Sequence, residues 1–174
     1  MSDFDDAGPA EIEDEVHEIR GALLNDTVRT LAPAEPICLP ESATVRDAVQ
    51  GMLARHQAGV LVVDPERRLV GIFTERDVLT RVVGKDLDAR GTPLGEVMTR
   101  EPEALSPDHR IAYAVRCMSV AGYRTIPLVD AERRPIGVVT VTDVIRWLAN
   151  LFPEAVLNLP PGDTLKRPDE VDSG

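Results

Sequence analysis

The sequence predicts an α/β fold of the α+β type, in which two β-α-β-β-α repeats pack sheet to sheet as a pseudo-twofold pair. The 174 residues, 43% of them apolar, suffice for one compact domain or two small units. Residues 36–83 align without a gap on residues 102–149, and both copies show the same order of strand and helix patterns. A unit of about 60 residues is marginally stable alone, so we expect the two copies to share one core.

The duplication is visible in residue identities. Fourteen of the 48 aligned pairs are identical, among them Met52 with Met118 and Asp77 with Asp143. The run Glu-Arg-Arg also occurs in both copies. We therefore divide the chain into an acidic N-terminal segment (1–26), a first repeat (27–85), a second repeat (86–150) and a C-terminal extension (151–174).

Each copy opens with a short extended segment, around Leu39 and Leu105, that precedes an amphipathic helix. In the first copy Thr44 can cap the helix together with Asp47. Apolar residues then recur from Val45 at i, i+3, i+4, i+7 and i+8, and the second copy repeats this stripe. The spacing predicts one helix here in each copy, with its methionine in the core.

Two β-branched runs follow in each copy, and a polar turn joins them into a hairpin. These runs are residues 60–63 and 69–73 in the first copy, and 125–129 and 135–141 in the second. A second helix is predicted to begin at Asp77 in the first copy and at Asp143 in the second. Gly84 is the expected end of the first of these helices.

The crossing from the last strand into this helix reads Gly-x-x-Thr-x-x-Asp in both copies, with Thr74 and Asp77 in one and Thr140 and Asp143 in the other. A hydroxyl and free amides at a helix N-terminus can hold a phosphate, and a carboxylate can accept both hydroxyls of a ribose. The pattern therefore fits a nucleotide cradle. It also fits a capping box, in which each side chain bonds its own helix, and a duplication copies caps as well as sites.

These crossings, the Ala-Val-x-x-Met helices and the strands ending in Val-Asp together resemble a tandem pair of cystathionine β-synthase (CBS) domains, the Bateman module, over residues 27–150. The resemblance implies two clefts between the repeats and a homodimer, parallel or antiparallel, that forms a disc of four repeats. It implies a regulator, such as an energy sensor, rather than an enzyme. The implied ligand is AMP, ADP or ATP, with or without Mg²⁺, and no cofactor is required.

The resemblance also implies which residues contact the ligand. Asp77 and Asp143 would take the ribose hydroxyls, and Thr74 and Thr140 would contact phosphate or ribose. Two arginines would meet phosphate, unless they are solvated or paired within the structure: Arg76 and Arg124. Backbone near the base and along the opposite wall would come from Ile37, Cys38, Glu103, Ala104, Gly59, Val60, Thr125 and Ile126.

The two copies differ at several of these positions. The pairs that differ are Ile37 with Glu103, Ala58 with Arg124, Leu61 with Pro127, and Arg76 with Thr142. We therefore expect unequal clefts, one of which binds its ligand much more tightly than the other.

Composition excludes several classes of protein. The net charge of −11 comes mainly from acidic ends around a nearly neutral body, so no basic stripe is present to bind nucleic acid. Apolar runs are too short to span a membrane, and no secretion signal opens the chain, so we expect a cytoplasmic protein. Cys38 and Cys117 are expected to be buried thiols, and they lack the partners of a zinc site. No catalytic motif accompanies the three histidines.

Outside the repeats, residues 10–24 predict an amphipathic helix, either solvated or packed on a dimer. Residues 151–161 are apolar enough to lie back on the repeats, whereas the last dozen residues are polar and expected to be disordered. Two alternatives to a nucleotide regulator stay open. One is a scaffold or dimerisation module without a ligand, and the other is a sensor of S-adenosylmethionine, NAD or a cyclic dinucleotide.

Overall fold

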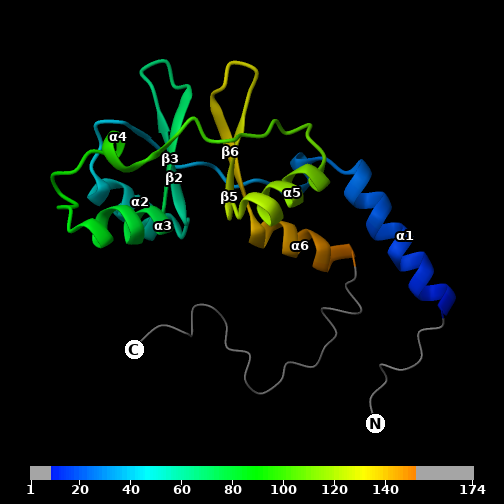
Figure 1. Cartoon of the computed structure of the whole chain (residues 1–174). Coiled ribbons are helices and arrows are strands. Elements are labelled where there is room, and N and C mark those ends of the chain that lie inside the picture. The colour runs from blue at the N-terminus through cyan, green and yellow to red at the C-terminus, as the bar shows by residue number, and fades with distance from the viewer. Residues whose placement is uncertain (1–8, 152–174) are drawn as a thin grey trace, which may run out of the picture.

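The computed structural model describes residues 9–151, apart from the side chains of residues 9–12 and 15. Two halves, each with a hairpin and flanking helices, stand next to each other, and the hairpin tips point to the same side (Figure 1). One sheet has the strand order β1-β2-β3-β4, and the other consists of β5 and β6. The result is the predicted α+β fold built from two similar units.

The first half contains β1 (Cys38–Pro40), α2 (Val45–Arg55), β2 (Gly59–Val63), β3 (Leu69–Thr74), α3 (Glu75–Asp77), η2 (Val78–Val82), η3 (Val83–Lys85), α4 (Leu94–Val97) and β4 (Thr99–Arg100). Strand β1 pairs in parallel with β2, whereas β2 with β3 and β3 with β4 are antiparallel. Helix α2 begins where the sequence predicts, because Thr44 and Asp47 form a capping box. The Thr44 N–H donates to Asp47 Oδ2 at 2.9 Å, and the Asp47 N–H donates to Thr44 Oγ1 at 3.2 Å.

The second half contains α5 (Ile111–Ala121), β5 (Thr125–Val129), β6 (Pro135–Thr140) and α6 (Val141–Leu151). Leu105 pairs in parallel with Leu128, as β1 does with β2 in the first half. Helix α5 has no side-chain cap, because Arg110 stands where Thr44 stands in the first half. The same element order is therefore reached with different local chemistry at the helix start.

Three predicted helix boundaries are wrong. The last helices begin at Glu75 and Val141, two residues before the predicted Asp77 and Asp143, because the preceding threonine ends the strand and the aspartate falls in the first turn. Gly84 is not the end of the first of these helices. It lies inside η3, and the left-handed residue that follows η3 is Asp86, with φ of 54°.

The segments at the start of the two repeats, ahead of the first strand of each, are exchanged between the halves. Residues 26–31, including η1 (Val28–Leu31), pack on the second half, where the Val28 N–H donates to the carbonyl of His109 at 2.8 Å. Residues 92–98 pack on the first half in the same way, since the Leu94 N–H donates to the carbonyl of Ala43 at 2.8 Å. Sequence identity gave no sign of this exchange, although each segment completes the core of the opposite half.

Three groups of buried residues hold the fold together. One core lies under α2 in the first half and includes Phe73, and a second lies under α5 and includes Leu105. A third group joins the halves through their sheets and consists of Leu61, Leu69, Ile72 and Val138. The two units therefore pack sheet to sheet, as predicted, and the shared group stabilises both.

The ends of the chain follow the prediction only in part. Helix α1 (Pro9–Asn25) covers the predicted N-terminal helix and packs on α5 through its last turns, where Ala22 and Leu23 are half-buried. Of the residues predicted for the apolar face of this helix, Val16 is 56% exposed, whereas Ile19 and Leu23 are half-buried. The predictions for residues 1–8 and 152–174 lie outside the described residues. Within residues 9–151 no helix has the length and hydropathy needed to cross a membrane.

Candidate functional site

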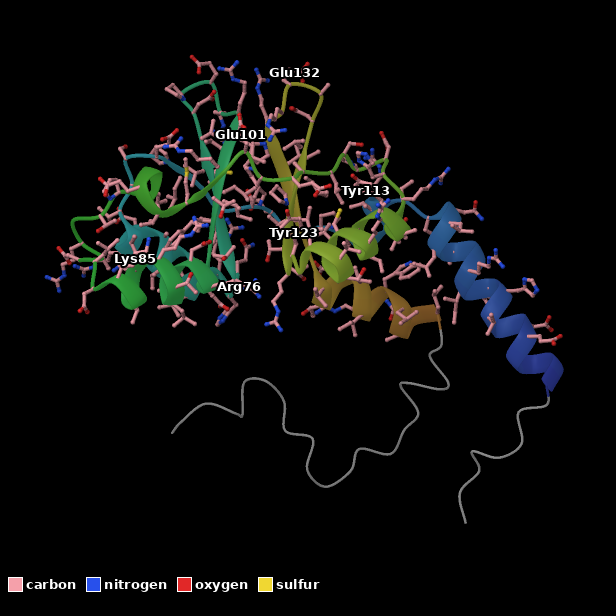
Figure 2. All side chains as sticks on the ribbon, viewed as in Figure 1. Arg76, Lys85, Glu101, Tyr113, Tyr123 and Glu132 are labelled. Carbon is pink, nitrogen blue, oxygen red and sulfur yellow. The ribbon has the colours of Figure 1, made fainter. Side chains whose placement is uncertain are left out.

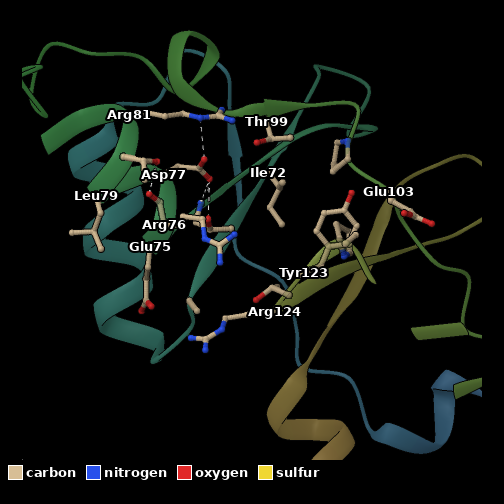
Figure 3. Close-up of a pocket in the computed structure, with 18 residues that line it drawn as sticks. Ile72, Glu75, Arg76, Asp77, Leu79, Arg81, Thr99, Glu103, Tyr123 and Arg124 are labelled. Carbon is tan, nitrogen blue, oxygen red and sulfur yellow. Dashed lines mark hydrogen bonds and ion pairs between the residues drawn. The ribbon is translucent and has the colours of Figure 1, made fainter. Parts of the chain in front are cut away.

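A cavity of about 520 Å³ lies between the two halves. One wall comes from the end of β3 and the start of the following helices, and the other from the second half (Figure 3). Its volume falls in the usual range of about 300 to 1,000 Å³ for small-molecule sites. Six of the residues predicted as ligand contacts line it: Thr74, Arg76, Asp77, Glu103, Arg124 and Thr125.

Asp77 is buried at the wall of this cavity, with 7% of its surface exposed. Its Oδ2 accepts a hydrogen bond from the Thr74 N–H at 2.9 Å and another from the Thr74 hydroxyl at 2.9 Å. This oxygen therefore closes the helix start, as the capping interpretation predicted. The capping role and the position beside the cavity coexist in one side chain.

The other oxygen of Asp77 has a different partner. Its Oδ1 lies 3.2 Å from Nε of Arg81, and Arg81 Nη1 also donates to the carbonyl of Val97 at 2.9 Å. Arg81 lies four residues after Asp77, a spacing that brings side chains together on a helix. The sequence therefore held the signal for this pair, but Arg81 was not among the predicted residues.

The opposite wall presents Tyr123, Arg124 and the segment around Glu103 (Figure 3). The Glu103 carboxylate accepts hydrogen bonds from the Tyr113 hydroxyl at 3.0 Å and from the Cys117 thiol at 3.4 Å. The bond to Glu103 and its negative charge raise the pKa of Tyr113 above the ordinary value. Burial is the main cause that raises the pKa of the Cys117 thiol, and the hydrogen bond from this thiol to Glu103 adds to it.

Two arginines bring unpaired charge to the cavity. Among the described residues, neither the Arg76 nor the Arg124 guanidinium has a hydrogen bond or an ion pair, while both line the cavity. They come from different halves, and Figure 3 shows both in the space between the walls. Together with Arg81 they place three guanidinium groups around a cavity that three acidic residues also line: Glu75, Asp77 and Glu103.

The remaining predicted contacts do not line this cavity. Ile37, Val60 and Ile126 are core residues, and Ala104 packs against the group between the sheets. Cys38 is half-buried rather than fully buried, and it borders a separate cavity of about 420 Å³ beside Pro65 and Arg67. The others that lie outside the main cavity are Gly59, Thr140 and Asp143.

Asp143 repeats the local geometry of Asp77 away from the main cavity. Its Oδ2 accepts from the Thr140 N–H and from the Thr140 hydroxyl, both at 2.8 Å, and its Oδ1 lies 3.3 Å from Arg146 Nη1. The cap is thus duplicated, whereas the cavity takes in the cap of the first half alone.

Comparison with known proteins identifies close similarity to one family. The family model for the CBS domain matches residues 28–84 and again residues 94–150. The protein MJ1225 of Methanocaldococcus jannaschii is 30% identical over 129 residues, which are 74% of this chain and 45% of that protein. The protein CBSCBSPB5 of Arabidopsis thaliana is 33% identical over 104 residues, which are 60% of this chain. The chain thus spans 45% of the first relative and 19% of the second.

Two solved structures share the fold. The CBS domain pair of protein MJ0100, in complex with 5′-methylthioadenosine and S-adenosyl-L-methionine, has a TM-score of 0.65 and 23% identity, and the match covers 72% of this chain and 97% of that chain. CBSX2 in complex with AMP has a TM-score of 0.61 and 24% identity, again over 72% of this chain and 97% of that chain. The first of them is a CBS domain pair, and this chain has two matches to the CBS-domain model.

Proposed function

Because this chain belongs to the CBS-domain family, we propose that the cavity beside Asp77 binds an adenine nucleotide of the AMP, ADP or ATP type. The observation that carries the proposal is the meeting, in one cavity, of a buried aspartate and two guanidinium groups without partners among the described residues. The protein would act as a regulator: it would bind the ligand without transforming it, and the bound state would be recognised by an effector protein.

The first half supplies the polar groups for a ribose. An ionised carboxylate has about four acceptor positions, and the two on Oδ2 of Asp77 are taken by Thr74. Oδ1 retains acceptor capacity beside Arg81, and both residues line the cavity. A ribose hydroxyl can therefore donate to Oδ1 without breaking the helix cap.

The two arginines without partners supply a site for phosphate. Arg76 and Arg124 approach the cavity from opposite halves, so a phosphate bound by both would connect the two repeats. Charge-assisted hydrogen bonds of this kind are roughly twice as strong as neutral ones. The complexes of MJ0100 and CBSX2 hold compounds that share an adenosyl group, which supports the same ligand class here.

Titration calorimetry of the full chain with AMP, ADP, ATP with and without Mg²⁺, and S-adenosylmethionine tests the proposal. We expect one tight site per chain for a nucleotide. Asp77→Asn keeps the shape of the side chain but removes its charge, and should weaken binding about tenfold or more. The matched variant Asp143→Asn should change the affinity less than about twofold.

Equal losses in the two variants, or two equivalent sites per chain, would contradict the assignment to the cavity beside Asp77. The alternative of a scaffold without a ligand predicts no thermal shift with any of these compounds. A ligand at 100 times its dissociation constant should instead stabilise the fold by about 2.7 kcal/mol.

An exposed apolar face on the helices supports a homodimer as a second part of the proposal. Leu53 on α2, Val120 on α5 and Ile145 on α6 are 71%, 79% and 60% exposed. These helices belong to both halves and lie away from the hairpin tips (Figure 1). Because the two halves present similar faces, a second copy can make a self-complementary contact there.

Light scattering coupled to size exclusion measures this association. Leu53→Glu and Val120→Glu should shift a dimer to monomers by placing charge in the contact. Glu132→Lys is the control, because Glu132 lies at the tip of the β5–β6 hairpin, at the opposite end of the molecule (Figure 2). A monomeric parent protein, or a dimer that survives both glutamate substitutions, would count against this face.

A further inference from the structure

Asp77 has one carboxylate oxygen available to a ligand, and Arg81 already stands beside it. Oδ2 receives both Thr74 donors, while Oδ1 lies 3.2 Å from Arg81 Nε. The carboxylate is almost fully buried, and Arg81 takes one of the two acceptor positions of Oδ1. A ribose hydroxyl that donates to the remaining position would share this oxygen with Arg81 and come to lie next to its guanidinium, which stands beside Asp77 in Figure 3.

Arg81 is held in this position from two sides. Its Nη1 donates to the carbonyl of Val97, the last residue of α4, at 2.9 Å. It also lies in η2, a π-helical turn that interrupts the last helix of the first half. Such turns are rare and often occur at functional sites. The side chain nevertheless lines the cavity and is 38% exposed, so it can turn toward a bound molecule.

The second half lacks this arrangement. Trp147 occupies the position equivalent to Arg81, is buried, and donates from Nε1 to Asp26 at 3.3 Å. The helix there, α6, runs from Val141 to Leu151 as a regular α-helix. Asp143 does pair with an arginine, Arg146, three residues further on. The arginine four residues after the aspartate and the irregular turn are specific to the half whose aspartate lines the cavity.

We propose that Arg81 makes this cavity select ligands that carry an anionic group over uncharged adenosyl compounds. An uncharged ligand that shares Oδ1 weakens the ion pair of Arg81 with Asp77 and offers no anion in return. A ligand with a phosphate offers the Arg81 guanidinium a second anionic partner and so compensates for the weakened ion pair. This inference rests on the proposed function, since it assumes a ribose at Asp77.

The test compares AMP with adenosine, which differ only in the phosphate, by titration calorimetry on the full chain. The parent protein should bind AMP at least about tenfold more tightly than adenosine. Arg81→Met keeps an unbranched, largely apolar stem but removes the guanidinium and its charge. It should weaken AMP about fivefold or more while adenosine binds equally well or more tightly.

Arg81→Lys retains the charge and should keep most of the preference for AMP, which supplies a second variant if the methionine variant folds poorly. The control is Arg146→Met, which removes the corresponding ion pair beside Asp143 and should leave the ratio of the two affinities unchanged. Circular dichroism and thermal melting verify folding.

A parent protein that binds AMP no more tightly than adenosine overturns the inference. So does an Arg81→Met variant that weakens both ligands by the same factor, because a purely structural role has that effect. In both cases the proposed function stands, since AMP still binds. If the parent protein binds neither compound, the proposed function itself fails, and the inference fails with it.

Discussion

The two halves of this molecule carry the same Thr-x-x-Asp cap, yet the main cavity includes the cap of the first half and not that of the second. The hydrogen bonds to Oδ2 differ by about 0.1 Å between the two halves, so the local geometry is nearly identical. The difference lies in what each aspartate faces. A duplicated motif is therefore necessary for such a site but does not make one by itself.

The facing wall explains the difference, because it belongs to the other half. Asp77 lies across the cavity from Tyr123 and Arg124. The positions equivalent to these two residues in the first half are Gln57 and Ala58. Tyr123 and Arg124 thus reach the cavity beside Asp77 from the second half, and Ala58 lines the same cavity from the first half.

The largest effect that separates the two halves should come from their cores. Phe73 and Val139 occupy equivalent positions and are both fully buried. Phe73→Ala should lower the free energy of unfolding by about 3 to 5 kcal/mol, whereas Val139→Ala should lower it by roughly 1.5 to 3 kcal/mol. Urea denaturation followed by circular dichroism measures both.

Trp147 fluorescence provides a separate probe of the second half. Because the group between the sheets joins the halves, the fluorescence and circular dichroism transitions should coincide in Phe73→Ala. A Trp147 transition that stays at the parent midpoint while the first half unfolds would show that the halves are independent.

A smaller effect should separate the helix starts. Thr44 caps α2 through its side chain, whereas Arg110 makes no side-chain cap at α5. Thr44→Ala should therefore cost about 1 kcal/mol of stability. Arg110→Ala should cost less, and equal losses in thermal or chemical unfolding would refute a special role for the Thr44 cap.

The smallest effects should appear at the extremes of pH, because the pKa values of two residues at equivalent positions are shifted in opposite directions. Hydrogen bonds from the Thr44 N–H and then its hydroxyl hold the pKa of Asp47 below its ordinary value. Its stabilising contribution is present above the unfolded pKa and is lost as the pH falls through the folded pKa. Tyr113 stands at the equivalent position, and its pKa is raised by the hydrogen bond to Glu103. Its contribution is present below the unfolded pKa and is lost as the pH rises through the folded pKa.

Melting temperatures as a function of pH test both directions. Asp47→Asn should reduce the loss of stability below about pH 4, and Tyr113→Phe should reduce the loss above about pH 10. Each variant serves as the control for the other, because Asp47→Asn should change the melting temperature only at acidic pH and Tyr113→Phe only at alkaline pH. Both side chains are exposed, so the shifts should be modest and should shrink at high salt if charge carries them.

Prediction from the sequence succeeded where local chemistry decides the structure. The capping box at Thr44 and Asp47 and the hairpin strands need only residues close in the chain, and their positions were predicted to within two residues. The last helices were placed too late because the aspartate was taken as the first helical residue. In the structure the threonine is the N-cap, and the helix begins directly after it.

The duplication, the α+β fold and the chemistry of the two caps follow from the order of residues alone, since periodicity and short-range spacing encode them. Long-range packing places Asp77 opposite Tyr123 and Arg124, brings Arg81 to both Asp77 and Val97, and exchanges the first segments of the repeats between the halves. These features depend on how distant segments pack. Contacts across the pair of halves have no fixed spacing along the chain, so they form only when the shared core brings the two sheets together.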